Sequence, residues 1–225
     1  MITGDKRIRV ITGHYGSGKS EFSMNYVVKL REMVEGKVAL ADMDVVNVYF
    51  RTREQSEFLE SIGVEPISSS VNAPTLDIPA ISAKVKTPMN DDSYSYVIDL
   101  GGDNVGARVL AGYRGLIKDG DYDFLCVVNA NREKTQDLQQ VMDYIKILEE
   151  NSKLKVTGLV NNTHMIHDTT TEDIMRGYEL CKEVSDKTGI PLKYNTCIEN
   201  LVDELPADMD GEIFPINLYM RPDWL

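Results

Sequence analysis

Residues 13–20 read GHYGSGKS and match the phosphate-binding loop pattern GxxxxGK[ST] at every fixed position. A β-branched, apolar run at 8–12 precedes this motif, and a helix-like stretch at 21–33 follows it. A strand, a glycine-rich loop and a helix in that order can wrap backbone N–H groups around an anion at the positive end of the helix. The motif therefore predicts an α/β fold that binds a nucleotide.

The residues of the motif have distinct expected roles. Lys19 is expected to reach the β- and γ-phosphates and to act in catalysis, and the Ser20 hydroxyl is expected to ligate Mg²⁺. The glycines allow backbone angles and close approaches that a Cβ would block. Nucleotide contacts are predicted for the whole loop and the residue after it, namely Gly13, His14, Tyr15, Gly16, Ser17, Gly18, Lys19, Ser20 and Glu21.

Short apolar strands alternate with amphipathic helices along the rest of the chain. Strands are expected at 37–41, 96–100, 124–128 and 156–160, helices at 107–118, 134–149 and 171–187, and a last edge strand at 212–218. This alternation predicts an α/β fold with three α/β/α layers and a doubly wound, mostly parallel sheet. Residues 68–92 are rich in Ser, Pro and Asn, and we interpret them as a surface insertion with a short helix near 79–85.

Length and composition limit the possible classes of function. The 225 residues, 42% of them hydrophobic, suit a single domain spanning 1–225. The net charge of -12 argues against binding of nucleic acid and against adsorption to an anionic membrane. No apolar stretch reaches the roughly 18 to 20 residues of a membrane span, so we expect a cytoplasmic protein. Cys126, Cys181 and Cys197 form no CxxC and are expected to be buried thiols.

Acidic residues follow two of the predicted strands. Asp99 ends the run YVIDL and begins a DxxG pattern with Gly102, whose N–H would approach a γ-phosphate. Asp42 and Asp44 alternate with Met43, so an extended chain turns both carboxylates to one side. We expect Asp44 and Asp99 to hold Mg²⁺ or its waters, and Asp44 to be the base or the water-positioning residue.

Other polar residues give less specific signals. Arg51 and Arg53 either clamp an anion or pair with nearby acids, and ion pairing is the favoured interpretation. The stretch HMIHD at 164–168 shows no third ligand at a recognisable spacing, so no metal is expected there. The guanine-reading tetrapeptide NKxD does not occur, and Asn162 is placed to offer an amide to a base edge, which favours ATP over GTP.

The chain resembles the SIMIBI-class family of MinD- and ParA-like ATPases, which includes the nitrogenase iron protein. The resemblance rests on four motifs and their order: the phosphate loop, the paired acids, the DxxG and a strand-ending Asn. The resemblance covers most of the chain and is weakest at 68–92. It implies Lys19 and Ser20 on phosphate and Mg²⁺, Asp44 as the water-activating switch acid and Asn162 on adenine. It also implies that the loop near 195–198, which includes Thr196, closes over the base.

The chain departs from that family at one functional position in particular. The family's loop reads GKGGxGK[ST], and its early signature lysine reaches the partner's nucleotide across a dimer, whereas this chain has His14 there. A neutral imidazole does not replace a fixed cation opposite developing phosphate charge. The chain therefore resembles a subgroup that lacks the signature lysine, which leaves a nucleotide-dependent homodimer as an open alternative.

Three functions remain for such a chain. The leading hypothesis is a Mg²⁺-dependent ATPase, slow without its partner, whose nucleotide state is read by an unidentified protein partner. The alternative is an ATP-dependent ligase or phosphoryl-transfer enzyme similar to dethiobiotin synthetase, in which 68–92 and the two arginines would form the second-substrate site. A third hypothesis is a nucleotide-sensing scaffold that binds ATP and hardly hydrolyses it.

Overall fold

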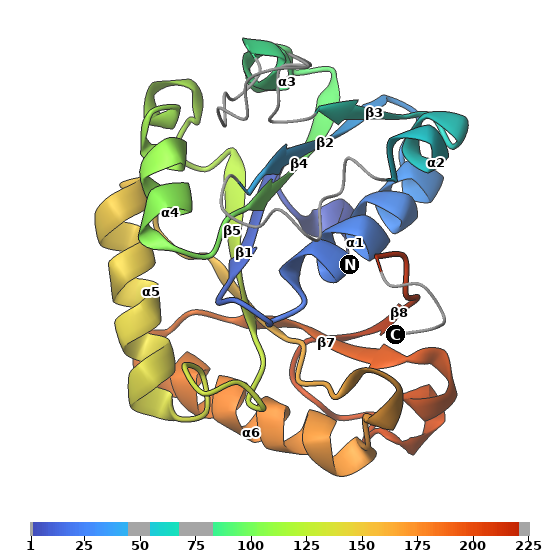
Figure 1. The fold of residues 1–225 in the computed structure, drawn as a ribbon, viewed down its shortest axis with the longest axis vertical. Helices are drawn as coiled ribbons and strands as arrows, with labels where there is room; N and C mark the ends of the chain where they lie inside the picture. The colour runs from blue at the N-terminus through green and yellow to red at the C-terminus, as the bar shows by residue number, and fades with distance from the viewer. Residues whose placement is uncertain (1, 45–54, 68–82, 221–225) are drawn as a thin grey trace, which may run out of the picture.

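The computed structural model describes residues 2–44, 55–67 and 83–220, which build one eight-stranded sheet with helices on both faces (Figure 1). All neighbouring strands run parallel, in the order β3-β2-β4-β1-β5-β6-β7-β8. The strands are β1 Ile8–Gly13, β2 Lys37–Met43, β3 Val64–Ile67, β4 Tyr94–Leu100, β5 Tyr122–Val128, β6 Gly158–Asn161, β7 Leu192–Ile198 and β8 Glu212–Ile216. The predicted doubly wound parallel sheet is confirmed.

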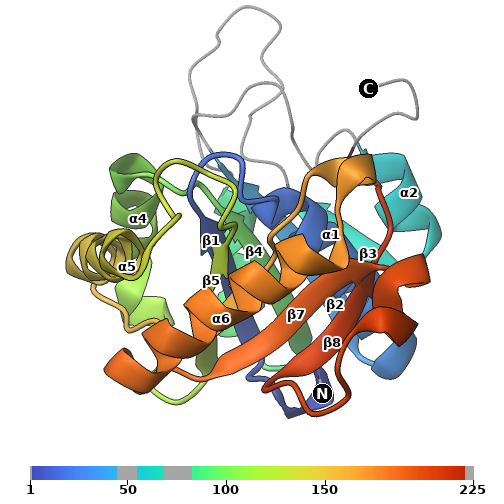
Figure 2. The same ribbon diagram turned by 90° about the horizontal axis from the view of Figure 1, so that it is seen from below.

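Helices cover both faces of this sheet and complete the predicted three layers. They are α1 Lys19–Met33, α2 Ser56–Ser61, α3 Lys86–Asn90, α4 Asn104–Ala111, α5 Leu138–Ser152 and α6 Thr171–Thr188. Phe22 of α1 and Leu59 of α2 belong to the hydrophobic cluster on one face, and Leu110 of α4, Val141 of α5 and Cys181 of α6 belong to the cluster on the other. Figure 1 shows α4 and α5 on one side of the sheet and α1 and α2 on the other, and Figure 2 shows α6 alongside β7.

The edge strand β3 is one element that the sequence does not reveal. Its four residues, VEPI, pair with β2 in register from Val64 to Ile67. Pro66 has no N–H and would interrupt a ladder in the middle of a sheet, but an edge strand has one side without a partner strand. The proline therefore fits the edge, although it makes the segment resemble a turn in the sequence.

Two helices have boundaries that differ from the prediction. The helix expected at 107–118 ends at Ala111, and a 3-10 turn follows at Arg114–Leu116. Gly112 and Gly115 have low helix propensity, which stops the helix early. The helix expected from residue 134 begins at Leu138, because the Asp137 carboxylate caps it by accepting from the N–H of Gln140 at 2.9 Å.

The predicted insertion at 68–92 lies partly outside the described residues. Its described end forms a 3-10 turn at Ala83–Val85 and the short helix α3, which comes later than the helix expected near 79–85. Val85 and Met89 are buried in the main hydrophobic cluster, and the Tyr96 hydroxyl donates to the Val85 carbonyl at 3.2 Å. This end of the segment is thus packed on the core.

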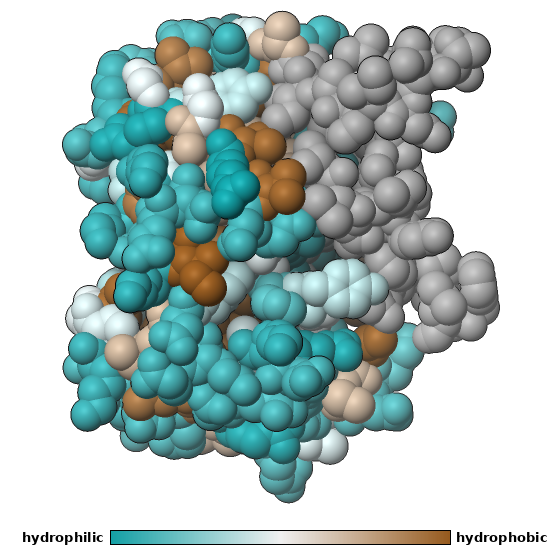
Figure 3. Space-filling model, turned by 60° about the vertical axis from the view of Figure 1, so that its left-hand side comes forward, coloured by the Kyte–Doolittle hydropathy of each residue, from teal (hydrophilic) through white to brown (hydrophobic). Residues whose placement is uncertain are grey.

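The surface of the described residues is mainly hydrophilic in the view of Figure 3, where hydrophobic residues lie in separate groups. None of the helices in the described ranges has both the length and the apolar character needed to cross a membrane. The three cysteines are free thiols inside the fold.

Gly177 provides a test of how α6 packs against the end of β6. A Cβ at this position would lie 2.0 Å from the Thr163 hydroxyl oxygen and 2.2 Å from Asn161 Oδ1. We expect Gly177→Ala to lower the free energy of unfolding by about 1–3 kcal/mol, as overpacking does, although alanine normally favours a helix. Urea denaturation measures this change.

The matched control is Gly115→Ala, because a Cβ at Gly115 would meet no atom within 4 Å. The control is expected to leave the free energy of unfolding unchanged or slightly raised. If Gly177→Ala were as stable as the unaltered chain, the close packing of α6 on the end of β6 would be contradicted.

Candidate functional site

The loops that follow the central strands meet at one edge of the sheet. Figure 2 shows the loop between β1 and α1 at the upper edge of the sheet. The chain runs from β1 to β2 on one side, and later passes from β4 across β1 to β5 on the other side. The carboxyl end of β1 is therefore a topological switch point, where open α/β sheets bind their ligands.

The phosphate-binding loop motif forms an open cradle between β1 and α1. Gly16 and Gly18 have φ values of 80° and 79°, in the left-handed region that favours glycine. Gly18 precedes α1 as its N-cap, and no side chain caps this helix. The loop and the first turn of α1 line a pocket of about 240 Å³ that contains the predicted residues His14, Tyr15, Gly16, Ser17, Gly18, Lys19, Ser20 and Glu21.

Lys19 is buried and forms an ion pair with Asp44. Its Nζ lies 2.7 Å from Asp44 Oδ2, and the Asp44 N–H donates to Asp42 Oδ1 at 3.1 Å. Burial alone would lower the pKa of Lys19, but the nearby carboxylates of Asp99 and Asp44 outweigh burial and raise the pKa above its ordinary value. Lys19 therefore carries its charge inside the site. Asp42 supports the backbone of Asp44 in this arrangement.

Asp99 lies at the end of β4, paired in register with Asp42 on β2. Burial raises the pKa of Asp99 to about 6, although Lys19 and the Ser20 hydroxyl act in the opposite direction. Its Oδ1 is buried and has no hydrogen-bond partner within the described ranges. A buried carboxylate oxygen without a donor, next to Ser20, suits a cation or a water held by a cation.

Gly102, the last residue of the DxxG pattern, packs directly on the start of the phosphate-binding loop. A Cβ at Gly102 would lie 1.8 Å from the Gly13 carbonyl oxygen, so only glycine fits this approach. The Tyr144 hydroxyl of α5 donates to the Gly102 carbonyl at 2.9 Å. The His14 ring meets the Tyr144 ring edge to face, with centroids 5.7 Å apart. The DxxG loop and the phosphate-binding loop are thus in contact through backbone and aromatic groups.

A second pocket of about 70 Å³ adjoins the first and contains the residues expected at the base. Asn162 and Thr196 line it, and the Asn162 amide donates from Nδ2 to the Ser17 carbonyl at 2.6 Å. The Thr196 hydroxyl hydrogen-bonds Asn162 Oδ1. Apolar side chains form much of the remaining wall, namely Ile166, Ile198, Ile216 and Leu218. The predicted loop at 195–198 therefore borders this pocket.

The segment after β8 completes both pockets, which the sequence did not indicate. Glu21 accepts hydrogen bonds from the backbone N–H groups of Tyr219 and Met220. Asn25 exchanges two hydrogen bonds with the backbone of Asn217, at 2.7 and 2.8 Å. Met220 lines the pocket at the phosphate-binding loop. Glu21, predicted to contact the nucleotide, therefore anchors this segment against α1.

Arg132, on the loop after β5, also lines the pocket at the phosphate-binding loop but has no place in the predicted site. Its Nε donates to the Gly16 carbonyl at 3.0 Å, and Asn129 Nδ2 donates to the same oxygen at 3.3 Å. The polar run NANR directly after a buried strand is the signal in the sequence, since strand ends gather at the ligand edge.

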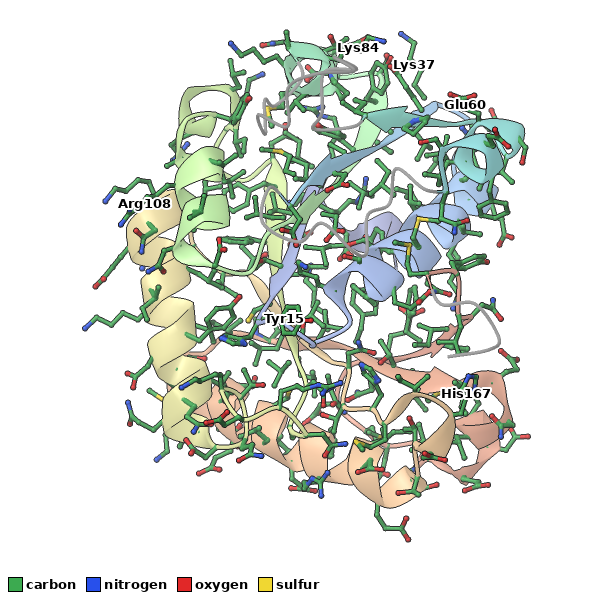
Figure 4. All side chains as sticks on the ribbon, in the orientation of Figure 1. Tyr15, Lys37, Glu60, Lys84, Arg108 and His167 are labelled. Atoms are coloured by element: carbon green, nitrogen blue, oxygen red, sulfur yellow. The ribbon has the colours of Figure 1, made fainter. Side chains whose placement is uncertain are left out.

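The remaining candidates are the two arginines after β2 and the two histidines of HMIHD. Arg51 and Arg53 lie outside the described ranges, so neither of their two interpretations is tested. His164 Nδ1 accepts from the Ile166 N–H at 3.3 Å, and the His164 side chain lines the second pocket. Figure 4 shows His167 well apart from Tyr15, which lies on the phosphate-binding loop. The two histidines of HMIHD therefore lie in different surroundings.

Comparison with known proteins identifies the fold of the chain but not its family. No protein-family model matches the sequence, and no curated protein matches it either. Among solved structures, FtsY from Mycoplasma mycoides matches with a TM-score of 0.53 at 16% identity, over 83% of this chain and 58% of that chain. FtsY from Thermotoga maritima matches with a TM-score of 0.50 at 20% identity, over 83% of this chain and 60% of that chain.

This chain spans less than two thirds of either FtsY chain. At such identities the likeness concerns the fold alone, which is a parallel α/β sheet with helices on both faces. The resemblance to the MinD- and ParA-like subgroup stays a prediction.

The buried charge of Lys19 can be tested through stability. Lys19→Met would leave the carboxylates of Asp42, Asp44 and Asp99 buried without the cation between them. We expect the free energy of unfolding of the nucleotide-free chain to fall by about 3 kcal/mol, as when one partner of a buried pair is removed. Urea denaturation at neutral pH measures this change.

Lys37→Met is the control, because Lys37 pairs with Asp91 at 3.2 Å on the exposed surface. Its effect on the denaturation midpoint is expected to be close to zero. Equal effects of the two substitutions would contradict the role of Lys19 as the cation that keeps the site's acids charged.

Proposed function

We propose that this chain binds MgATP at the phosphate-binding loop and hydrolyses it slowly, as a switch that a protein partner reads. The observation that carries the proposal is the meeting of Lys19 and Ser20 with the buried acids Asp44 and Asp99 beneath an open helix N-terminus. This combination brings a cation, a hydroxyl and two carboxylates together next to the phosphate-binding loop. Phosphoryl transfer requires these groups.

The phosphates would lie in the cradle formed by the loop and the first turn of α1. Helix N-termini attract anions because their first N–H groups have no intrahelical acceptors, and no side chain caps α1. Lys19 lines the same pocket and stays protonated. Backbone donors and one lysine thus supply the positive side of the site.

The side chains of Ser20 and Asp99 are also suitable ligands for Mg²⁺. The described ranges hold no group of three His, Cys, Asp or Glu side chains that could bind a metal alone. Mg²⁺ usually binds through one or two carboxylates together with substrate phosphates and water. Ser20 and Asp99 would hold the ion or its waters. In support, the buried Asp99 Oδ1 has no donor among the described residues. When bound, the ion would neutralise charge on the phosphates.

The Lys19–Asp44 pair supports a switch. Asp44 is held by Lys19, with 2.7 Å between Asp44 Oδ2 and Lys19 Nζ. A γ-phosphate that binds Lys19 competes with Asp44, so the carboxylate would be released to orient water or to accept its proton. Asp44 directly precedes residues 45–54, which lie outside the described ranges. The release of Asp44 is the change that a partner would read.

The second pocket supports a purine, and we assign adenine. Its apolar walls suit the faces of a base, and the Asn162 amide can offer one further N–H and one further lone pair beyond its bonds to Ser17 and Thr196. Competition between ATP and GTP for a fluorescent triphosphate tests this assignment. Tighter binding of GTP would contradict it.

Asp44→Asn tests the switch role. The substitution keeps the shape of the side chain but removes the proton acceptor, so hydrolysis should fall by about a hundredfold while ATP still binds. Phosphate release, with and without candidate partners, and calorimetric titration with MgATP measure these two effects.

Lys19→Ala is the comparison, and it should abolish ATP binding. If Asp44→Asn left basal and partner-stimulated hydrolysis unchanged while Lys19→Ala abolished binding, the role of Asp44 would be wrong. Turnover that depends on one added acid or amine would instead indicate a ligase, and binding without turnover in any mixture would indicate a scaffold.

A further inference from the structure

Arg132 is an arginine held in place at the mouth of the pocket by a rigid turn. The Arg132 N–H donates to the Asn129 carbonyl at 3.0 Å, and its own carbonyl accepts from the Thr135 N–H at 2.9 Å. The Thr135 hydroxyl donates to the Asn129 carbonyl at 2.7 Å, and both of these residues are fully buried. The backbone that carries Arg132 is therefore held at the end of β5 by hydrogen bonds within its own turn.

The guanidinium of Arg132 is fixed at one nitrogen only. Its Nε donates to the Gly16 carbonyl at 3.0 Å, and a Cβ at Gly16 would lie 2.9 Å from that Nε. The glycine thus provides room for the side chain at the apex of the loop. In the part of the chain that the structure describes, the two terminal nitrogens of Arg132 make no hydrogen bond or ion pair. They remain able to bind an anion in the pocket that Arg132 lines.

The charges around the pocket show why a second cation matters. Lys19 and Arg132 are the two fixed cations among the described lining residues. Lys19 is already paired with Asp44, and Asp99 adds a further acid beside it. A triphosphate that enters this acidic site can pair with Lys19 only if the ion pair between Lys19 and Asp44 breaks. Arg132 has no acid partner to leave within the described ranges.

We propose that Arg132 binds the polyphosphate of the nucleotide from the same chain and makes the site prefer nucleotides with more phosphate groups. The inference rests on the proposed function, because it assigns a residue to the phosphates of that site. A guanidinium offers two parallel N–H donors that match phosphate oxygens, and its bond to Gly16 reduces the conformational freedom lost on binding. Arg132 is thus a phosphate-binding residue rather than only a support of the loop.

The test compares the affinities for AMP, ADP and MgATP of the unaltered chain and of Arg132→Ala, Arg132→Gln and Arg132→Lys, by calorimetric titration. The loss of a charged hydrogen bond predicts about a ten- to hundredfold weaker affinity for ATP in Arg132→Ala and Arg132→Gln. Affinity for AMP should change by less than about threefold. Arg132→Lys keeps the charge and should recover part of the loss.

The control is Arg108→Ala. Arg108 lies on α4, where its Nε donates to Asn151 at 3.2 Å, and Figure 4 shows it pointing outward, away from Tyr15. This substitution removes the same charge outside the pocket and should leave all three affinities unchanged. A second readout is salt: ATP affinity should fall less steeply with added KCl in Arg132→Ala than in the unaltered chain.

Two results would overturn the inference. Equal weakening of AMP, ADP and ATP in Arg132→Ala, without recovery in Arg132→Lys, would show that Arg132 only supports the loop. Unchanged affinity for ATP in a folded Arg132→Ala would show that it has no part in binding, and circular dichroism establishes the folding. If the unaltered chain bound no nucleotide at all, the proposed function itself would fail, and the inference with it.

Discussion

The ammonium of Lys19 is buried at the start of α1 and stays charged because Asp44 and Asp99 face it. Burying a charge is costly unless opposite charges and hydrogen bonds compensate, so the pairing of these residues stabilises the buried lysine. Three elements supply them: α1 provides the lysine, and the ends of β2 and β4 provide the acids. In the proposed switch, a phosphate that binds the lysine would change the surroundings of Asp44.

Backbone packing joins this charge cluster to the rest of the site. The Gly13 carbonyl and Gly102 approach so closely that no Cβ fits between them, and the Tyr144 hydroxyl donates to the Gly102 carbonyl. Gly18 is in similar contact with Asn162, because a Cβ on Gly18 would lie 2.3 Å from the Asn162 amide nitrogen. The loop therefore touches the DxxG segment and the second pocket at once, through positions where only glycine fits.

Much of the fold and part of the site can be predicted from the sequence, for physical reasons that differ between elements. The strands around β1 are continuous apolar runs, and the GxxxxGK[ST] motif specifies both its loop and the flanking strand and helix. Asp99 and Asp44 follow recognisable strands, so their convergence follows from parallel topology. By contrast, β3 contains Pro66 and is only four residues long, so its strand character depends on pairing with β2.

Residues brought to the site from distant parts of the chain could not be found in this way. Glu21 anchors Tyr219 and Met220, a contact across almost the whole sequence that leaves no local pattern. Arg132 ends a polar run that follows a buried strand, but its proposed role depends on the bond to Gly16, which only the structure reveals. Asn162 was expected to bind a base, but its amide also holds the Ser17 carbonyl, which only the structure reveals.

The central claim is that a triphosphate takes Lys19 away from Asp44. A crystal structure of the full chain with Mg²⁺ and a non-hydrolysable ATP analogue tests it most directly. The account predicts Lys19 Nζ within hydrogen-bonding distance of the β- or γ-phosphate, with the present 2.7 Å contact to Asp44 Oδ2 broken. An analogue bound elsewhere, or bound in the loop with the Lys19–Asp44 pair intact, would contradict it.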